Sequence, residues 1–303
     1  MYRLLSYRTQ EGATRAGMLL GDRIHDLENE FKAARLRPGI ETASLIAIFR
    51  SWERSKPYLD KIAAAPQTDG VARSSAKLAA PLQYPGVIYM AGANYVAHIL
   101  EMNPGAPPDK SKTQPYFFLK TVDGTVIGPD ETIHLPSYSQ KVDWEAEIAF
   151  VVGRKARHVT VEDAMDYIAG YTIVNDLSAR DRSRRDDVPF IYDWIGQKCF
   201  DTSCPMGPWI VPADQITDPK NLPIKLWVND RLEQNSNTND MFFDYAEQLS
   251  WLSKHVTLNP GDVVSTGTPP GVGMGKGVFL KHGDTVTIEI EGVGRLSNPC
   301  VQD

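Results

Sequence analysis

Residues 143–153, Asp-Trp-Glu-Ala-Glu-Ile-Ala-Phe-Val-Val-Gly, constrain the fold of this chain more than any other segment. They are predicted to form a β-strand because two sets of side chains alternate, and one set is apolar throughout: Trp144, Ala146, Ile148, Phe150 and Val152. Glu145 and Glu147 then lie on one face, about 7 Å apart by the strand rise. Buried carboxylates repel each other unless a cation joins them, and a hard divalent ion such as Mg²⁺, Mn²⁺ or Ca²⁺ prefers oxygen ligands. The pattern fits such a metal site, and it fits equally a solvated strand face with two ordinary surface glutamates.

The composition and charge argue against several classes of protein. Of the 303 residues, 42% are hydrophobic and 23% are charged, as in an ordinary soluble globular protein. The net charge of −6 disfavours a nucleic-acid partner or an anionic membrane surface. No apolar run is long enough to predict a membrane span, and the N-terminus lacks the apolar core of a signal peptide. The three cysteines show no zinc-binding spacing and fit a reducing compartment, so we expect a cytoplasmic protein without nucleic-acid or membrane partners.

The order of elements predicts a β-rich α+β fold rather than alternating βαβ units. Residues 1–72 are predicted as a small N-terminal α/β domain, with short strands first and a helical apolar stripe over 41–64. A linker over 66–75 leads into the main domain, residues 73–303. There the patterns predict strands at 87–92, 117–120, 171–175, 223–228, 231–234, 262–265 and, as the last clear one, 285–290; they predict helices at 94–102, 160–167 and 241–255.

Asp176 is a third candidate metal ligand, because it ends the apolar strand predicted at 171–175. With Glu145 and Glu147 it would form a three-carboxylate site, and water or substrate would complete the coordination. Asp176 could also cap the turn that follows, and the two roles are compatible.

His98 and Glu101 form a second candidate pair, since three-residue spacing on a helix brings two side chains to one face. A carboxylate beside an imidazole fixes its tautomer and raises its basicity, as in a general base. A plain surface pair has the same spacing. The pair precedes residues 103–112, which are rich in Pro, Gly and Lys and are predicted to be an exposed lid loop.

Two further segments carry candidate chemistry. Lys198 lies in an apolar setting, where a buried ammonium could neutralise carboxylates or donate to a substrate oxygen; an exposed lysine is the alternative. Residues 266–273, Thr-Gly-Thr-Pro-Pro-Gly-Val-Gly, form a loop whose backbone N–H groups could hold an anion. The loop lacks the Lys-Ser/Thr ending of a nucleotide-binding loop, so a substrate carboxylate is the expected anion.

Five ordered segments resemble the fumarylacetoacetate hydrolase family, in particular its acylpyruvate hydrolase and oxaloacetate decarboxylase branch. They are Gly-Ala-Asn-Tyr-Val-Ala-His at 92–98, Glu-Ala-Glu at 145–147, Val-Asn-Asp-Leu-Ser-Ala-Arg-Asp at 174–181, Gln-Lys-Cys-Phe-Asp-Thr at 197–202 and the loop 266–273. The resemblance covers roughly residues 80–300 and implies a mixed β-roll around a metal, usually in a homodimer. It also implies that the N-terminal residues are the small extra domain that many members carry.

The resemblance also implies roles for individual residues. Glu145, Glu147 and Asp176 match Mg²⁺ ligands, His98 and Glu101 match a lid-helix dyad that activates water, and Lys198 matches the lysine beside the metal. The remaining matches are expected to bind substrate: Asn94, Tyr95, Lys120, Arg180, Gly267 and Thr268. Four positions depart from the family pattern: Ala91 replaces an aspartate ligand of longer members, Ala93 an arginine, Ser183 a substrate-binding glutamine and Cys199 a serine. These departures concern the identity of the substrate more than metal binding.

The function expected from the resemblance is metal-dependent hydrolysis of a carbon–carbon bond in a 2,4-dioxo acid, an acylpyruvate or fumarylpyruvate of the kind met in aromatic catabolism. His98 would activate the water, and the metal and Lys198 would stabilise a pyruvate enolate. The alternatives are decarboxylation or tautomerisation of an oxaloacetate-like 2-oxo acid, which share that enolate, and hydratase or lyase chemistry on a sugar-derived 2-oxo acid. A binding protein that keeps the fold and the metal without catalysis is a further alternative.

Overall fold

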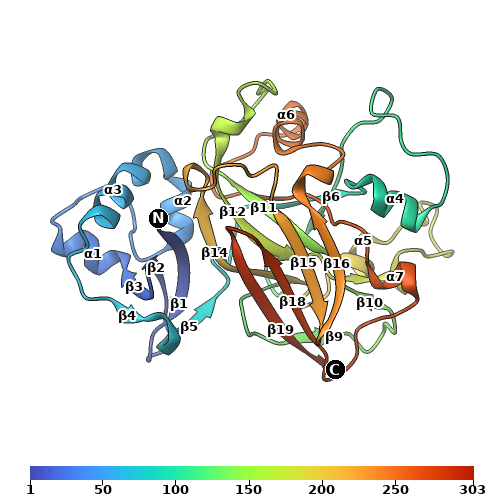
Figure 1. Ribbon diagram of the computed structural model, residues 1–303, viewed down its shortest axis with the longest axis horizontal. Coiled ribbons are helices and arrows are strands. Elements are labelled where there is room, and N and C mark those ends of the chain that lie inside the picture. Colours follow the sequence, from blue (N-terminus) through green and yellow to red (C-terminus); the bar gives the residue numbers. More distant parts are fainter.

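The computed structural model describes residues 1–303 and contains three β-sheets flanked by seven α-helices. The largest sheet has twelve strands in the order β4-β3-β2-β1-β14-β12-β11-β17-β6-β7, with β5 paired to β1 and β8 to β14. Most neighbours are antiparallel, whereas β17 runs parallel to β6 and β8 parallel to β14. The fold is therefore the predicted β-rich, mixed α+β fold, and its sheets do not close into a barrel (Figure 1).

The predicted Glu145/Glu147 strand is β11 (Ala146–Val152), in the middle of the large sheet between β12 (Ile168–Asn175) and β17 (Val263–Ser265). Every residue of β11 and β12 is buried. The alternation along β11 thus separates two apolar cores rather than core from water: Ile148 and Phe150 belong to one cluster, and Ala149 and Val151 to the other. The alternative of a solvated strand face is wrong.

The N-terminal segment extends the same sheet. Its strands are β1 (Arg3–Arg8), β2 (Thr14–Leu20), β3 (Arg23–Asp26), β4 (Val71–Ala72) and, just after it, β5 (Lys77–Ala79). Strand β1 pairs with β14 (Cys204–Pro212), and Figure 1 shows this blue segment on the left. Leu4 and Phe49 share an apolar cluster with Ala149 and Val174 of the central strands, so one face of β11 packs toward the N-terminal helices. The domain division between residues 72 and 73 stays a prediction.

The predicted helical region 41–64 is two helices, α2 (Leu45–Arg50) and α3 (Trp52–Ala64), which follow α1 (Leu27–Ala33). The helix is interrupted at Ser51, whose backbone leaves the helical conformation at φ −123° and ψ 35°. The apolar stripe continues across the break, since Phe49 and Trp52 stack with ring centroids 4.8 Å apart. Side-chain periodicity therefore could not reveal the interruption.

The second large sheet has the order β16-β15-β18-β19-β9. Strands β15 (Pro223–Val228) and β16 (Arg231–Asn237) form the predicted hairpin across Asn229-Asp230, and β18 (Thr285–Ile290) is also as predicted. Strand β19 (Gly294–Gln302) was missed, because its inward residues include Asn298 and it contains a proline. It pairs with β18 and, in parallel, with β9 (Ile133–Leu135).

Four helices belong to the main part of the chain: α4 (Val96–Met102), α5 (Trp194–Lys198), α6 (Tyr245–His255) and α7 (Gly273–Lys276). The first and third are the helices predicted at 94–102 and 241–255, each with a later start. Helix α6 begins with a capping box in which the side chains of Asp244 and Glu247 each accept a hydrogen bond from the other residue's backbone N–H. The helix predicted at 160–167 is wrong: only a short 3₁₀ turn forms, Ala164–Tyr167.

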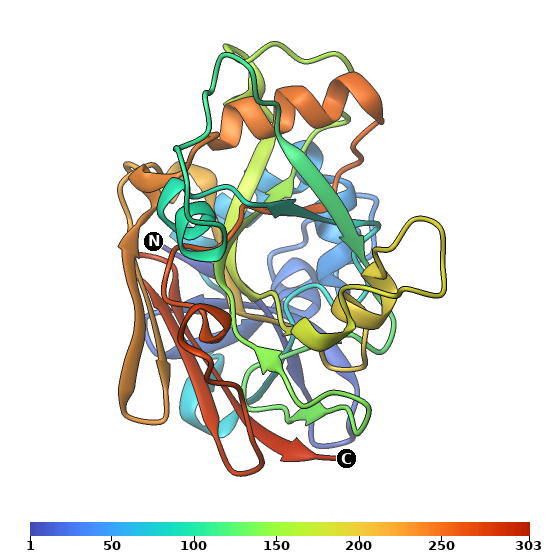
Figure 2. The ribbon, with the colours of Figure 1, turned by 90° about the vertical axis from the view of Figure 1, so that its right-hand side faces the viewer.

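Five further strands complete the sheets: β6 (Ile88–Gly92), β7 (Tyr116–Lys120), β8 (Val126–Ile127), β10 (Val142–Asp143) and β13 (Ser178–Ala179). Strands β10 and β13 pair with each other as a third, two-stranded sheet. Figure 2 shows α4 beside α7 on the face of the molecule where the sheets meet. None of the helices is both long enough and apolar enough to cross a membrane.

Candidate active site

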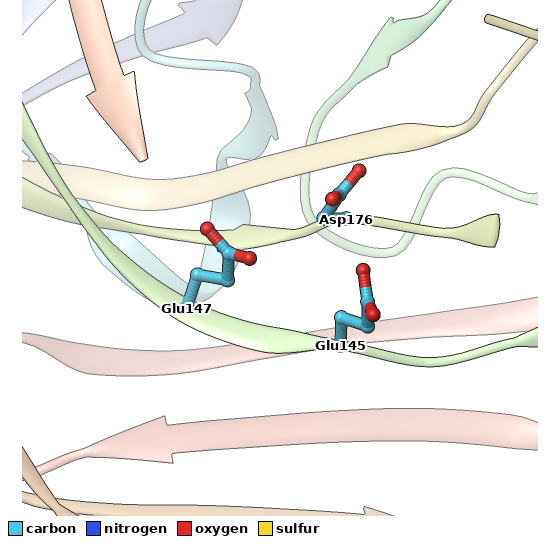
Figure 3. A group of neighbouring side chains, drawn as sticks. All are labelled: Glu145, Glu147 and Asp176. Atoms are coloured by element: carbon cyan, nitrogen blue, oxygen red, sulfur yellow. The ribbon is translucent and has the colours of Figure 1, made fainter. Parts of the chain in front are cut away.

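Glu145, Glu147 and Asp176 meet at the end of the central strands (Figure 3). Glu145 and Glu147 come from one face of the β11 segment, and Asp176 directly follows β12. The antiparallel register pairs Ala146 with Asn175, so the backbone N–H of Asp176 donates to the carbonyl of Glu145 at 2.9 Å. All three side chains are buried, and one oxygen of each lies within 4.8 Å of the others.

Three cations, two of them buried, neutralise part of this charge. Lys198 Nζ donates to Glu145 Oε2 at 2.5 Å and to Asp176 Oδ2 at 2.6 Å. Arg180 Nη2 donates to Glu145 Oε1 at 2.6 Å. Lys120 Nζ lies 3.0 Å from Asp176 Oδ1, an ion pair whose angles fall outside those of a hydrogen bond. Lys198 is thus a buried lysine joined to two carboxylates, and the alternative of an exposed lysine is wrong.

Glu147 lies outside this ion-pair network. Its Oε2 accepts hydrogen bonds from Ser265 Oγ at 2.5 Å and from the backbone N–H of Gly267 at 2.9 Å, with no cation in contact. Burial and the nearby carboxylates of Asp176 and Glu145 raise the pKa of Glu147 well above its usual range. Burial acts in the same direction on Glu145, but Arg180 and Lys198 override it and hold the pKa of Glu145 well below its usual range.

The donor set fits a hard divalent cation. Three carboxylates converge, Glu147 lacks a positive partner, and the buried Oδ1 of Asp176 accepts no hydrogen bond. Carboxylate oxygens are the ligands that Mg²⁺, Mn²⁺ and Ca²⁺ prefer, and a divalent charge would relieve the repulsion that acts on Glu147. The acidic cluster can therefore hold a metal ion through Glu145, Glu147 and Asp176.

His98 faces the carboxylates from α4. Its Nδ1 lies 3.3 Å from Glu101 Oε2, and its Nε2 lies 4.0 Å from Glu145 Oε1. Glu101 in turn accepts the backbone N–H of Gly271 at 3.0 and 3.1 Å. His98 is the only buried residue of α4, so the alternative of a plain surface pair is wrong. The arrangement presents one imidazole nitrogen to the acidic cluster and holds the other against a carboxylate.

The loop 266–273 does bind carboxylates, but they belong to the protein. Gly267 donates its backbone N–H to Glu147, Gly271 to Glu101, and Gly273 to Asp143 at 2.6 Å. The side chain of the buried Gln234, which the sequence reading missed, donates to Thr268 Oγ1 and to the carbonyl of Pro269, and accepts from Ala146 N–H. Three backbone N–H groups of the loop are therefore already paired with carboxylates of the chain itself, and binding of a substrate carboxylate by the loop stays a prediction.

A cavity of about 270 Å³ opens above the acidic cluster, and His98, Arg180, Lys198 and Thr268 line it together with the three carboxylates. The other predicted substrate-binding residues do not line it: Asn94, Tyr95, Lys120 and Gly267. The Asn94 side chain instead bonds the backbones of Phe243 and Thr266, which joins two loops behind the cavity wall. Among the positions that depart from the family pattern, Ala91, Ala93 and Ser183 line the cavity.

An aromatic wall, which the sequence reading missed, forms one side of the cavity. Trp194 stacks on Phe118 at 5.0 Å and on Tyr192 at 6.2 Å between ring centroids, and Tyr116 lines the same side. Gln197 lies one helical turn after Trp194 on α5 and also faces the cavity. Gln197 as a whole residue is 8% exposed, and its side chain makes no hydrogen bond within the protein. Its position directly before Lys198 was the only signal in the sequence.

The β-rich fold and the buried cluster of three carboxylates, which could hold a divalent metal, together indicate an enzyme family. Residues 87–301 match the family model described as fumarylacetoacetate (FAA) hydrolase, C-terminal. The chain therefore belongs to the fumarylacetoacetate hydrolase family and is an enzyme of that family, as the sequence motifs predicted.

Curated relatives and solved structures agree with this assignment. The chain is 47% identical over 233 residues to a mitochondrial oxaloacetate tautomerase of Xenopus laevis, which covers 76% of this chain and 70% of the relative. It is 42% identical over 241 residues to a mitochondrial oxaloacetate tautomerase of Homo sapiens, covering 79% and 74%. The structure of maleylpyruvate hydrolase from Sphingobium sp. SYK-6, in complex with manganese(II) and pyruvate, superimposes with a TM-score of 0.77 at 30% identity over 99% of both chains.

Proposed function

We propose that this protein is a divalent-metal-dependent tautomerase that interconverts the keto and enol forms of oxaloacetate or a closely similar 2-oxo diacid. The observation that carries the proposal is the placement of His98, with Nε2 toward the acidic cluster and Nδ1 held by Glu101. The identities of 47% and 42% with two oxaloacetate tautomerases support the choice of reaction. The sequence alone had favoured hydrolysis of a 2,4-dioxo acid, with tautomerisation as an alternative.

Glu145, Glu147 and Asp176 would hold the metal, Mg²⁺ or Mn²⁺. When bound, such an ion acts as a Lewis acid that polarises the 2-oxo group of the substrate. His98 removes the proton from the carbon next to that group, the C–H electron pair moves onto the 2-oxo oxygen as an enolate, and protonation of that oxygen gives the enol; the reverse steps restore the keto form. Glu101 keeps the imidazole in one tautomer. Lys198 and Arg180 place positive charge beside the developing enolate oxygen.

The cavity also supports recognition of a second, distal carboxylate. The carboxamide of Gln197 faces the cavity and makes no hydrogen bond within the protein, so its donors are free to bind a ligand. The rings of Phe118 and Trp194 cover the same side and exclude water from the reacting atoms. Two N–H donors of the amide suit a carboxylate oxygen of a short diacid.

Hydrolysis of an acylpyruvate is the second candidate, and the likeness to maleylpyruvate hydrolase favours it. The same His98–Glu101 pair would then remove a proton from water, and the water would attack the distal carbonyl of the substrate. The products separate the candidates. Tautomerisation changes only the ratio of enol to keto form, hydrolysis releases pyruvate and a second acid, and decarboxylation releases CO₂.

The test is to follow the ultraviolet absorbance of the enol of oxaloacetate with purified protein and Mg²⁺ or Mn²⁺, while pyruvate and CO₂ are assayed in parallel. We expect the enol to disappear faster than in the uncatalysed reaction, without either product. His98→Gln should slow this by about 100-fold or more, since general acid–base catalysis contributes at least that much. His134→Gln is the matched control, because His134 is also paired with a carboxylate, at 2.8 Å from Asp303, but is exposed. Release of pyruvate with a second acid from acylpyruvates, without enol conversion, would overturn the proposal.

A further inference from the structure

Asp143 is completely buried next to the candidate active site. Its Oδ1 accepts the backbone N–H of Gly273 at 2.6 Å, and its Oδ2 accepts that of Met274 at 3.0 Å. Its Oδ2 also accepts a hydrogen bond from Arg180 Nε at 2.9 Å. One carboxylate therefore holds the start of α7 and the guanidinium that binds Glu145.

Residues 271–275, here named the lid seat, contact helix α4 through Glu101, and α4 contains His98. Gly271 donates its backbone N–H to Glu101, and its φ of 104° is one that side chains other than glycine rarely adopt. At Gly275 an added Cβ would lie 2.7 Å from Glu101 Cγ and 2.8 Å from Oε1. Glu101 therefore rests directly on the backbone of the lid seat, and no larger residue fits at Gly275.

Helix α4 is anchored before its first turn, where Asn94 bonds Phe243 and Thr266 and Tyr95 is fully buried, but few contacts fix its C-terminal end. His98 is its only buried residue, and the segment that follows, 103–112, is almost entirely exposed. A segment with few buried apolar contacts has low local stability, so a few polar contacts decide where it rests. The contact of Glu101 with the lid seat holds the C-terminal half of α4, in which His98 Nε2 lies 4.0 Å from Glu145 Oε1.

We propose that Asp143 is a positioning residue that couples the lid helix to the acidic cluster. On one side it holds the lid seat and thereby Glu101 and His98; on the other it holds Arg180, which binds Glu145. The imidazole of His98 and the carboxylate of Glu145 that faces it are thus both positioned by the same buried residue, Asp143. The catalytic meaning of this coupling rests on the proposed function, but the coupling itself can be measured without turnover.

Asp143→Asn tests the coupling, because the amide keeps the shape of the carboxylate and faces its N–H donors with an –NH₂ group. We expect α4 to leave the lid seat, so that His98 reacts several-fold faster with diethyl pyrocarbonate, measured by mass spectrometry against the exposed His134 in the same sample. Gly275→Ala disturbs the seat from the side of Glu101 and should produce the same increase. Asp26→Asn is the matched control, since Asp26 also accepts a backbone N–H at the start of a helix, α1, and also pairs with an arginine, Arg15, but lies in the N-terminal segment.

The second test measures kcat and KM of the variants. In Asp143→Asn, kcat for the enol–keto conversion should fall about tenfold or more with little change in KM. Adding Asp143→Asn to Glu101→Gln should cause a loss smaller than the product of the two single losses, because only the part that acts through Arg180 remains. A residue that only stabilises the fold would instead multiply the two losses. Unchanged reactivity of His98 in both Asp143→Asn and Gly275→Ala overturns the coupling. Increased reactivity in a protein without tautomerase activity overturns the proposed function alone.

Discussion

Replacing Lys198 by methionine should destabilise the metal-free protein far more than an equivalent change at the surface. Methionine keeps most of the side-chain volume, so the main loss is the ammonium that joins Glu145 and Asp176 at 2.5 and 2.6 Å. Removing one partner of a buried ion pair leaves an uncompensated charge and costs about 3–5 kcal/mol. Arg180 and Lys120 remain in contact with the two carboxylates, so we expect the lower end of that range, about 3 kcal/mol.

The measurement is urea unfolding of the chelator-treated protein, compared with Lys220→Met. Lys220 is the matched control because its Nζ lies 2.6 Å from Asp244, as close as Lys198 is to Asp176, but its side chain is 49% exposed. An exposed ion pair contributes about 0–1 kcal/mol, so this variant should unfold close to the wild type. Mn²⁺ should restore part of the stability of Lys198→Met, since a cation bound only by the folded state stabilises it. If the two variants lose the same free energy of unfolding, the bridging role of Lys198 is wrong.

Two further substitutions test the metal site and the distal end of the cavity. Glu147→Gln should keep the free energy of unfolding of the metal-free protein within about 1 kcal/mol, because the raised pKa of Glu147 already favours its neutral form. The affinity for Mn²⁺, measured by calorimetry, should fall more than about 100-fold, because a ligand is lost. Unchanged Mn²⁺ affinity would contradict the ligand role. Gln197→Leu should raise KM for oxaloacetate about tenfold, since a hydrogen bond to a charged group contributes about 1.5–3 kcal/mol. The inhibition constant of oxalate should not change, because oxalate lacks the distal group. An equal effect on both constants would place Gln197 at the metal end instead.

The predictions that were right from sequence depend on residues close together in the chain. The two-residue spacing of Glu145 and Glu147 places both on one strand face, and the three-residue spacing of His98 and Glu101 places both on one helix face. The hairpin at Asn229-Asp230 follows from the same kind of local chemistry, since Asn229 adopts φ 54°. The homodimer and the cytoplasmic location stay predictions.

The predictions that failed depend on contacts between distant segments. The alternation in β11 is real, but burial on both faces depends on the N-terminal segment and the second sheet. The helix predicted from Thr160 had an N-cap signal, but only a 3₁₀ turn forms there, directly before β12. No local pattern indicated that three N–H groups of the loop 266–273 bind Glu147, Glu101 and Asp143 of the same chain. Binding of a substrate carboxylate by this loop stays a prediction.

The sequence by itself determined which chemical groups are present and which of them share a strand or helix face, because side-chain periodicity is a property of the local backbone. It thereby determined two carboxylates of the metal site and the histidine–glutamate pair. Only the tertiary structure decided that Asp176 meets Glu145, since the register of β11 against β12 sets that distance. It also decided that Arg180 binds Asp143 and Glu145, and that the lid seat holds Glu101. These contacts join residues tens to more than a hundred positions apart, and no local pattern records which distant partner a buried charge will find.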